Sequence, residues 1–184
     1  MARVLDYEIC ETASFTFTDL LPDWGAEHEP LLAGLPATLS PDGAWIILSI
    51  HSWIVWIDGK IVLIDTGAGN GKKRPFAPYF DQLTTSYLAR LQALGGGTPE
   101  AVDYVLHTHL HVDHVGWNTR LVDGHWIAIF PNARHVFSAK EYDFFRDPAN
   151  ANARHHTSLQ AQQDSVTPIV DAGLADMISI DVAK

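Results

Sequence analysis

The sequence has 184 residues, of which 47% are hydrophobic and 18% charged, and its formal net charge is −10. This length suits one compact domain with a sizeable core, and the apolar content excludes an intrinsically disordered chain. The excess of acidic residues opposes binding to a phosphate backbone, so we expect no nucleic-acid partner.

The longest apolar stretch, residues 45–57, is interrupted by Ser49, His51 and Ser52 and is too short for a membrane-spanning helix. Acidic residues lie near the N-terminus, where a signal peptide would carry an uninterrupted apolar segment. Cys10 is the only cysteine, which excludes an internal disulfide and a thiolate-rich zinc site, and we expect it to be a small buried hydrophobe. We therefore expect a soluble, cytoplasmic protein with no membrane partner.

The first predicted elements are two strands joined by a tight turn. Residues 44–57 and 60–65 are rich in Ile, Val and Trp, and the Asp-Gly pair at 58–59 is a strong two-residue hairpin signal. The second strand runs directly into residues 65–71, whose glycines permit backbone conformations closed to other residues. We expect a β-hairpin that ends in a tight loop.

A helix and a third strand are predicted next. Leucine and tyrosine recur at spacings of three and four residues between positions 83 and 94, and glycines at 95–97 follow, which predicts a helix that stops there. Thr98, Pro99 and Glu100 are typical of a helix cap and first turn. Residues 102–106 form a short apolar strand that leads directly into a group of histidines.

Strands and helices continue to alternate in the rest of the chain. Residues 133–137 predict a strand, and residues 138–145 begin with the capping-box spacing that opens a helix. Residues 153–172 predict a weaker helical region interrupted by Pro168, and residues 177–182 predict a final strand. The alternation predicts an α/β fold in a single domain over residues 1–184.

Residues 107–114 carry four histidines and one aspartate, all side chains that ligate zinc or iron. Side chains alternate in an extended segment, so His109, His111 and Asp113 can project to one side while His114 points elsewhere. Such a segment would serve two metal ions. A surface run of histidines, or a set of buried structural imidazoles, is the alternative, and the dense spacing at the end of a strand favours the metal site.

The residues around these histidines indicate how they are held. Leu110 and Val112, between the candidate ligands, would anchor the loop in the core, and Gly116 lets the chain turn away afterwards. The remaining histidines are isolated or form one adjacent pair, and we expect them to be ordinary structural or surface residues: His28, His51, His125, His135, His155 and His156.

Two motifs resemble those of the metallo-β-lactamase superfamily. Residues 109–114, read as His-x-His-x-Asp-His, resemble its signature, and residues 63–67, Leu-Ile-Asp-Thr-Gly, resemble its earlier strand-end motif. The longer strings 108–118 and 130–137 look most similar to the branch that contains lactonases and organophosphate or ester hydrolases. The resemblance implies a metallo-β-lactamase αββα sandwich.

The same resemblance assigns roles to particular residues. It implies that His109 and His111 bind a first divalent metal ion, that Asp113 and His114 bind a second, and that Asp65 supports the metal loop through hydrogen bonds. The two ions would be Zn²⁺, with iron or manganese as alternatives, and they would supply hydroxide near neutral pH. The implied activity is hydrolysis of a small-molecule lactone, carboxylic ester or phosphate ester.

Two further side chains are candidates for this chemistry. Asp113 would be a catalytic residue as well as a ligand, because its carboxylate can relay a proton to the leaving group. Trp117, three residues after His114, would wall the substrate pocket.

The resemblance spans only the N-terminal half of a family domain. A complete member would add a third histidine, a bridging aspartate and a last histidine, and the given sequence has no equivalent of them. Half a sandwich leaves one sheet face uncovered, so we expect a second chain, a homodimer partner or further residues to complete the fold. Two alternatives remain: a non-catalytic half-domain that needs a partner chain to complete the metal site, and an iron-dependent oxidoreductase resembling sulfur dioxygenases.

Overall fold

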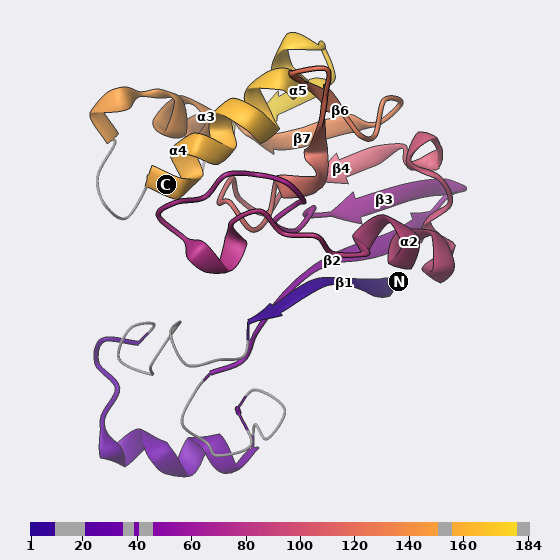
Figure 1. Ribbon diagram of the computed structural model, residues 1–184. Coiled ribbons are helices and arrows are strands. Elements are labelled where there is room, and N and C mark those ends of the chain that lie inside the picture. Colours follow the sequence, from indigo (N-terminus) through magenta and orange to yellow (C-terminus); the bar gives the residue numbers. More distant parts are fainter. Residues whose placement is uncertain (10–20, 35–38, 41–45, 151–155, 180–184) are drawn as a thin grey trace. The chain divides into compact units, whose positions relative to one another are not determined.

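Figure 1 presents a computed structural model of the chain, which describes residues 1–9, 21–34, 39–40, 46–150 and 156–179. The contacts group the residues into two compact units, Met1–Tyr7 with Ile50–Lys184, and Glu8–Ser49. The second unit contains a 3-10 helix, Ala26–Gly34. Cys10 and His155 lie outside the described residues, so their expected roles stay predictions.

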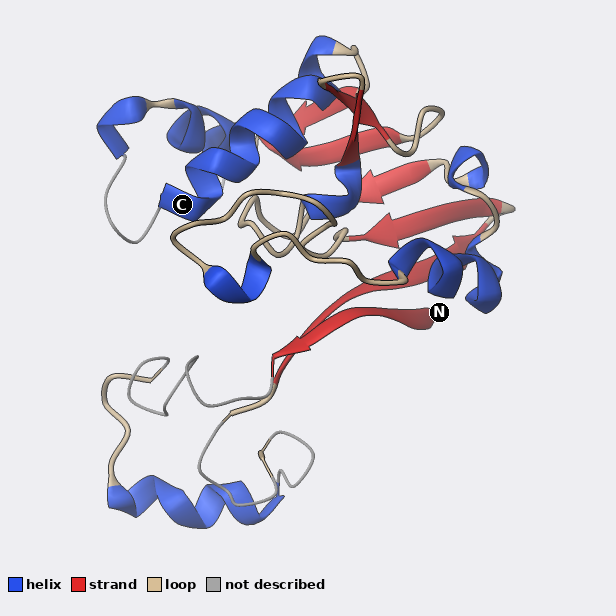
Figure 2. Ribbon diagram, in the orientation of Figure 1, coloured by secondary structure: helices blue, strands red, loops and turns tan. Residues whose placement is uncertain are grey.

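The first unit contains both strands and helices (Figure 2). The strands are β1 (Ala2–Ile9), β2 (Leu48–Ile57), β3 (Lys60–Ile64), β4 (Tyr104–Leu106), β5 (Thr119–Val122), β6 (His125–Ala128), β7 (Arg134–Ser138) and β8 (Ala175–Ile178). The α-helices are α2 (Tyr87–Leu91), α3 (Ala139–Arg146), α4 (His156–Ala161) and α5 (Thr167–Asp171). Short π-helical turns are Gln92–Gly96 and Gln162–Val166, and 3-10 turns are Pro78–Phe80, Pro99–Ala101, Gly116–Asn118 and Pro148–Asn150. The predicted α/β class is confirmed.

The main sheet has the strand order β1-β2-β3-β4-β7-β8, and β5 and β6 form a separate two-stranded sheet. Strands β2 and β3 are antiparallel, whereas β3, β4, β7 and β8 pair in parallel. In this register Ile64 at the end of β3 lies opposite Leu106 at the end of β4. Because parallel strands end at the same edge of a sheet, the loops after β3 and β4 begin side by side.

Two Asp-Gly turns make the hairpins. Asp58 and Gly59 have φ values of 50° and 75°, as a two-residue turn of this kind requires, so the predicted hairpin between β2 and β3 is confirmed. Its first strand starts at Leu48 rather than at residue 44, and residues 44 and 45 lie outside the described part. The second pair, Asp123 and Gly124, with φ values of 49° and 83°, joins β5 to β6. This second hairpin was not predicted from the sequence.

The helix predicted over residues 83–94 is shorter than expected. The helix proper is α2, and a π-helical turn with a left-handed Gly95 (φ 84°) ends it, as the predicted glycine stop requires. Residues before α2 are held in a loop, because the Asn70 carboxamide bonds both the N–H and the C=O of Thr85 at 2.8 Å. These bonds fix the backbone there in a conformation that does not continue the helix.

The elements near the end of the chain follow the prediction with small shifts. Helix α3 begins as expected, with the Ser138 hydroxyl accepting a hydrogen bond from the Glu141 N–H. The predicted helical region is divided next to Pro168, as expected: a π-helical turn ends at Val166, and Pro168 lies in the first turn of α5, where a missing N–H costs no hydrogen bond. The final strand is β8, two residues earlier than predicted, and residues 153–155 and 180–182 lie outside the described part.

The two faces of the main sheet differ in burial. Ile54, Leu63 and Val105 are register partners on one face, and each is fully buried. On the other face, Tyr104 and Leu106 are 38% and 37% exposed. The packed face carries the hydrophobic core, which consists of Val4, Ile54, Leu63, Tyr87, Leu91, Val102, Val105, Trp117, Ile129, Phe130 and Ala133. Within the described part of the chain, no helix is both long and apolar enough to cross a membrane.

The loops that follow β3 and β4 interlock through their backbones. Thr66 donates its N–H to the carbonyl of His114 at 2.7 Å and accepts the N–H of Trp117 at 2.9 Å. Gly116 donates its N–H to the carbonyl of Gly67 at 2.7 Å. These bonds hold the predicted metal loop against the end of β3.

A cluster of buried charges holds another part of the first loop. Lys72 and Arg74 are 0% and 1% exposed, and the Arg74 guanidinium makes a bidentate ion pair with Asp164 at 2.6 and 2.9 Å. The Lys72 ammonium donates to the Thr119 hydroxyl at 2.9 Å and lies 3.9 Å from the centre of the Trp126 ring. Burial lowers the pKa of Lys72 to about 8, although the charge of Asp164 opposes the shift.

We predict that Gly116→Ala lowers the free energy of unfolding by about 3 kcal/mol or more, because two backbone segments approach each other too closely here to admit a methyl group. A Cβ at this position would lie 1.9 Å from the backbone carbon and oxygen of Ala68. Gly34→Ala is the control, since no atom lies within 4 Å of its added Cβ. Urea unfolding measures both, and equal midpoints for the two variants would contradict the close approach.

A second prediction concerns Lys72 and pH. The unfolded chain keeps this lysine protonated up to its ordinary pKa of 10.5, whereas the folded protein releases the proton near pH 8. Between these values the unfolded state binds more protons, so stability rises with pH, by about 3 kcal/mol at most. Urea unfolding from pH 7.5 to 10.5 should show this rise in the wild type and in the exposed-site control Lys73→Met, but not in Lys72→Met. A parallel pH dependence in all three proteins would refute it.

Candidate metal centre

The histidine loop after β4 is not extended throughout, because residues 112–114 form a turn. The N–H of His114 donates to the carbonyl of His111 at 3.0 Å, which closes a turn. As a result the ring of His109 has its centre 4.5 Å from that of His111 and 3.9 Å from that of His114. The expectation that His114 would point away from His109 and His111 was wrong, because it assumed a strand where the chain turns.

Two buried apolar residues fix this loop, as predicted. Leu110 is fully buried and Val112 is 6% exposed. Their positions alternate with those of the histidines, so the turn has an apolar side in the core and an imidazole side. The three gathered rings are therefore held by packing as well as by hydrogen bonds.

The carboxylate of Asp113 lies beside the gathered rings. One of its oxygens is 3.3 Å from Nε2 of His114. Burial would raise the pKa of Asp113, but the hydrogen bond and the positive charge of His114 hold it below its usual range. Burial would likewise lower the pKa of His114, yet its bonds to Asp113 and Asp65 raise it to about 9. Without a metal ion the pair is thus a carboxylate and an imidazolium.

Asp65 joins the end of β3 to this loop. Its carboxylate accepts the N–H and the hydroxyl of Thr108 at 2.8 and 2.7 Å, and Nδ1 of His114 donates to it at 2.9 Å. The Asp65 backbone has a φ of 58°, a left-handed conformation that residues other than glycine rarely adopt. The strain turns the side chain toward the histidine loop, and three hydrogen bonds offset it.

His107 has a different role from the other three imidazoles of the cluster. Its side chain is fully buried, Nδ1 lies 3.2 Å from the carbonyl of His114, and Nε2 lies 3.2 Å from Nδ2 of Asn118. Burial lowers the pKa of His107 to about 4, so the ring is neutral and accepts from the Asn118 amide. It is a structural histidine beneath the loop.

Two residues that support the site were not predicted from the sequence. Thr108 bonds Asp65 and also places its hydroxyl 3.0 Å from Nδ1 of His109, which orients that ring. Asn118 links His107 to the hydroxyl of Thr66, which donates to Asn118 Oδ1 at 2.9 Å. Both are small polar residues next to the motifs, and that adjacency was the available signal.

Trp117 lies in the hydrophobic core. Its indole is 6% exposed and stacks on Tyr87 with ring centres 5.1 Å apart and an interplanar angle of 17°. The structure therefore gives no support to the expected role of Trp117 in the wall of a substrate pocket.

The donor set fits zinc or iron in kind but does not form a closed site. Among the residues that the structure describes, no three His, Cys, Asp or Glu side chains are placed to hold a metal ion. The two nitrogens of His114 face the carboxylates of Asp65 and Asp113, at 2.9 and 3.3 Å. The described residues thus gather donors without completing a metal site by themselves.

We predict that Asp65→Asn destabilises the protein by about 2–4 kcal/mol. The NH₂ group of the asparagine would face the hydrogen-bond donors of Thr108 or His114, and the negative charge that faces His114 would be lost. Asp123→Asn is a matched control, since residue 123 is exposed and its left-handed conformation suits asparagine. Urea unfolding compares the two, and a wild-type midpoint for Asp65→Asn would show that the bonds of Asp65 contribute little.

The chain matches the family model of the metallo-beta-lactamase superfamily over residues 46–177. Among solved structures, the hydrolase AbOPH of the beta lactamase superfamily is 25% identical to this chain, with a TM-score of 0.68. The match covers 99% of this chain and 58% of the AbOPH chain. No curated protein matches the sequence.

Two further structures share the fold. A probable metal-dependent hydrolase from Staphylococcus aureus is 24% identical with a TM-score of 0.62, covering 87% of this chain and 55% of its own. AidC, a dizinc quorum-quenching lactonase, is 21% identical with a TM-score of 0.64, covering 99% and 58%. The chain thus spans less than two thirds of the length of each. Because the family model matches well over half of its residues, the chain belongs to the metallo-beta-lactamase superfamily.

Proposed function

We propose that the protein is a metal-dependent hydrolase, and that His109, His111, Asp113 and His114 are ligands of a centre with two divalent metal ions. The observation that carries this proposal is the gathering of three imidazole rings, with centres 3.9 and 4.5 Å apart, beside the Asp113 carboxylate. Membership of a hydrolase superfamily supports it, and the dizinc lactonase AidC has the same fold. Zinc is the favoured metal, with iron or manganese as alternatives.

The proposed centre needs ligands besides those that the described residues gather. We propose that they come from further residues of the protein, a second chain or a homodimer partner. Divalent ions, when bound, lower the pKa of coordinated water and polarise a carbonyl or phosphoryl oxygen. The roles that we assign to this chain are narrower: Asp65 orients the loop and His114, and Asp113 carries a proton toward the leaving group.

We propose a small-molecule lactone, carboxylic ester or phosphate ester as the substrate. All three place an electrophilic carbon or phosphorus next to a polarisable oxygen, which is the chemistry that such a centre serves. The solved structures of similar fold include a lactonase.

The test of this proposal is zinc binding by single-site variants. His109→Ala and His111→Ala should each weaken zinc binding by at least about 100-fold, because a ligand is lost. His125→Ala removes an exposed histidine on β6 and should bind zinc as the wild type does. Competition with a chromophoric chelator and elemental analysis measure binding, and hydrolysis of lactones, esters and phosphotriesters with and without chelator measures activity.

The outcomes separate this function from its alternatives. Equal zinc binding by the wild type and His109→Ala would refute the ligand assignment. A folded protein that binds zinc weakly and hydrolyses none of the substrates would instead be a non-catalytic half-domain, an alternative that the missing three-ligand group among the described residues favours. Iron in the elemental analysis, with a matching optical spectrum, would point to an oxidoreductase similar to sulfur dioxygenases.

A further inference from the structure

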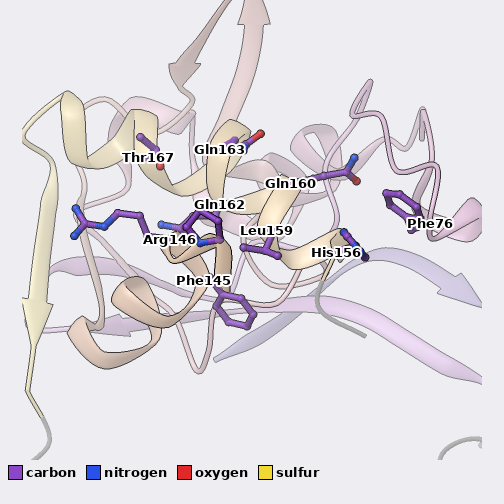
Figure 3. Close-up of a pocket in the computed structure, with 10 residues that line it drawn as sticks. Phe76, Phe145, Arg146, His156, Leu159, Gln160, Gln162, Gln163 and Thr167 are labelled. Atoms are coloured by element: carbon purple, nitrogen blue, oxygen red, sulfur yellow. The ribbon is translucent and has the colours of Figure 1, made fainter. Parts of the chain in front are cut away.

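A cavity of about 420 Å³ lies between α3, α4 and the π-helical turn that follows α4 (Figure 3). Its walls include the rings of Phe76, Phe145 and His156 and the side chain of Leu159. Phe76 and His156 stack with ring centres 4.8 Å apart and an interplanar angle of 26°. This volume lies in the range of small-molecule sites, and flat aromatic walls favour a flat ligand.

A buried carboxamide also lines this cavity. Gln162 is 2% exposed, and within the described part of the chain neither its amide nitrogen nor its amide oxygen has a hydrogen-bond partner. In Figure 3, Gln162 is drawn between Arg146 and Leu159, with Phe145 below it. A buried amide without partners destabilises a fold, so a residue kept in this state suggests a partner outside the described residues, and a bound ligand is one that the adjoining cavity can admit.

The chemistry of Gln162 defines what that partner must carry. A carboxamide presents a donor and an acceptor side by side in one plane, and its complement is a planar group with an adjacent acceptor and donor. We propose that the cavity binds an aromatic ring that bears such an edge, as an aromatic carboxamide does. The ring packs against Phe145 and Leu159, which lie next to Gln162 in Figure 3, and Gln162 bonds the edge.

The cavity adjoins the histidine loop through one shared side chain. Phe145 lines the cavity, and its ring centre is 5.6 Å from that of His111, with the two planes at 71°. A ligand in the cavity therefore lies one aromatic ring away from a proposed metal ligand. The identification of this ligand as the recognition group of a substrate rests on the proposed function. The binding of the ligand in the cavity does not depend on that function.

The test measures binding without turnover, using the full chain with no added metal. Nicotinamide is the probe, because it joins an aromatic ring to a carboxamide, and 3-acetylpyridine is the matched compound that lacks the donor. Amide NMR spectra should show nicotinamide shifting residues 145, 156 and 162, with 3-acetylpyridine binding more weakly. Gln162→Met should weaken nicotinamide binding about tenfold and abolish the preference between the two compounds.

The control variant is Gln163→Met, which makes the same change at an exposed position on the rim of the cavity. It should bind nicotinamide as the wild type does. Gln162→Met should also raise the melting temperature by about 2–8 °C, because it removes an unpaired buried amide, and this shows that lost binding is not lost folding. If Gln162→Met fails to fold, Gln162→Asn keeps the amide but withdraws it from the ligand, and its binding should weaken as well.

Unchanged nicotinamide binding in the folded Gln162 variants, or no shifts around the cavity in the wild type, would overturn the proposal. Equal affinities for nicotinamide and 3-acetylpyridine would overturn the role of Gln162. Failure of the proposed hydrolase function has a separate signature, namely no metal-dependent turnover while nicotinamide still binds.

Discussion

The carboxylate of Asp65 is the interaction on which the arrangement of the candidate site depends. It accepts hydrogen bonds from the backbone and hydroxyl of Thr108 and from the ring of His114, and so joins the loops that follow two neighbouring parallel strands. The register that sets Ile64 opposite Leu106 brings those loops together in the first place. The sheet thus sets the approximate position of the two loops, and one buried carboxylate sets the orientation of the histidine rings.

Backbone contact between the same loops makes this arrangement stiff. Thr66 bonds the backbone on both sides of Gly116, and Gly116 lies against the backbone of Ala68 with no room for a side chain. Beneath them a neutral His107 fills the core and is bonded to the Asn118 amide. A site built in this way loses little freedom when a ligand binds, because the protein has already ordered it during folding.

Local signals in the sequence predicted those parts of the fold that local chemistry determines. The Asp-Gly turn after β2, the capping serine of α3 and the glycine that ends α2 follow from backbone conformation and nearby hydrogen bonds. The extent of α2 could not be predicted, because it depends on a hydrogen bond between Asn70 and the backbone of Thr85, fifteen residues apart in the sequence. The convergence of His109 and His114 was also out of reach, since it depends on a turn that alternation along a strand does not describe. The Gln162 cavity combines segments far apart in the sequence, and no single motif marks it.

The uneven burial of the central sheet affects how the stability of this chain should be interpreted. Strands of parallel sheets are ordinarily covered on both faces, yet Tyr104 and Leu106 on β4 remain more than a third exposed. Any molecule that covers this face and binds only the folded chain raises the free energy of unfolding by mass action. The apparent melting temperature therefore depends on the concentrations of the chain and of the molecule that covers this face. A value measured on the dilute, isolated chain is its lower limit.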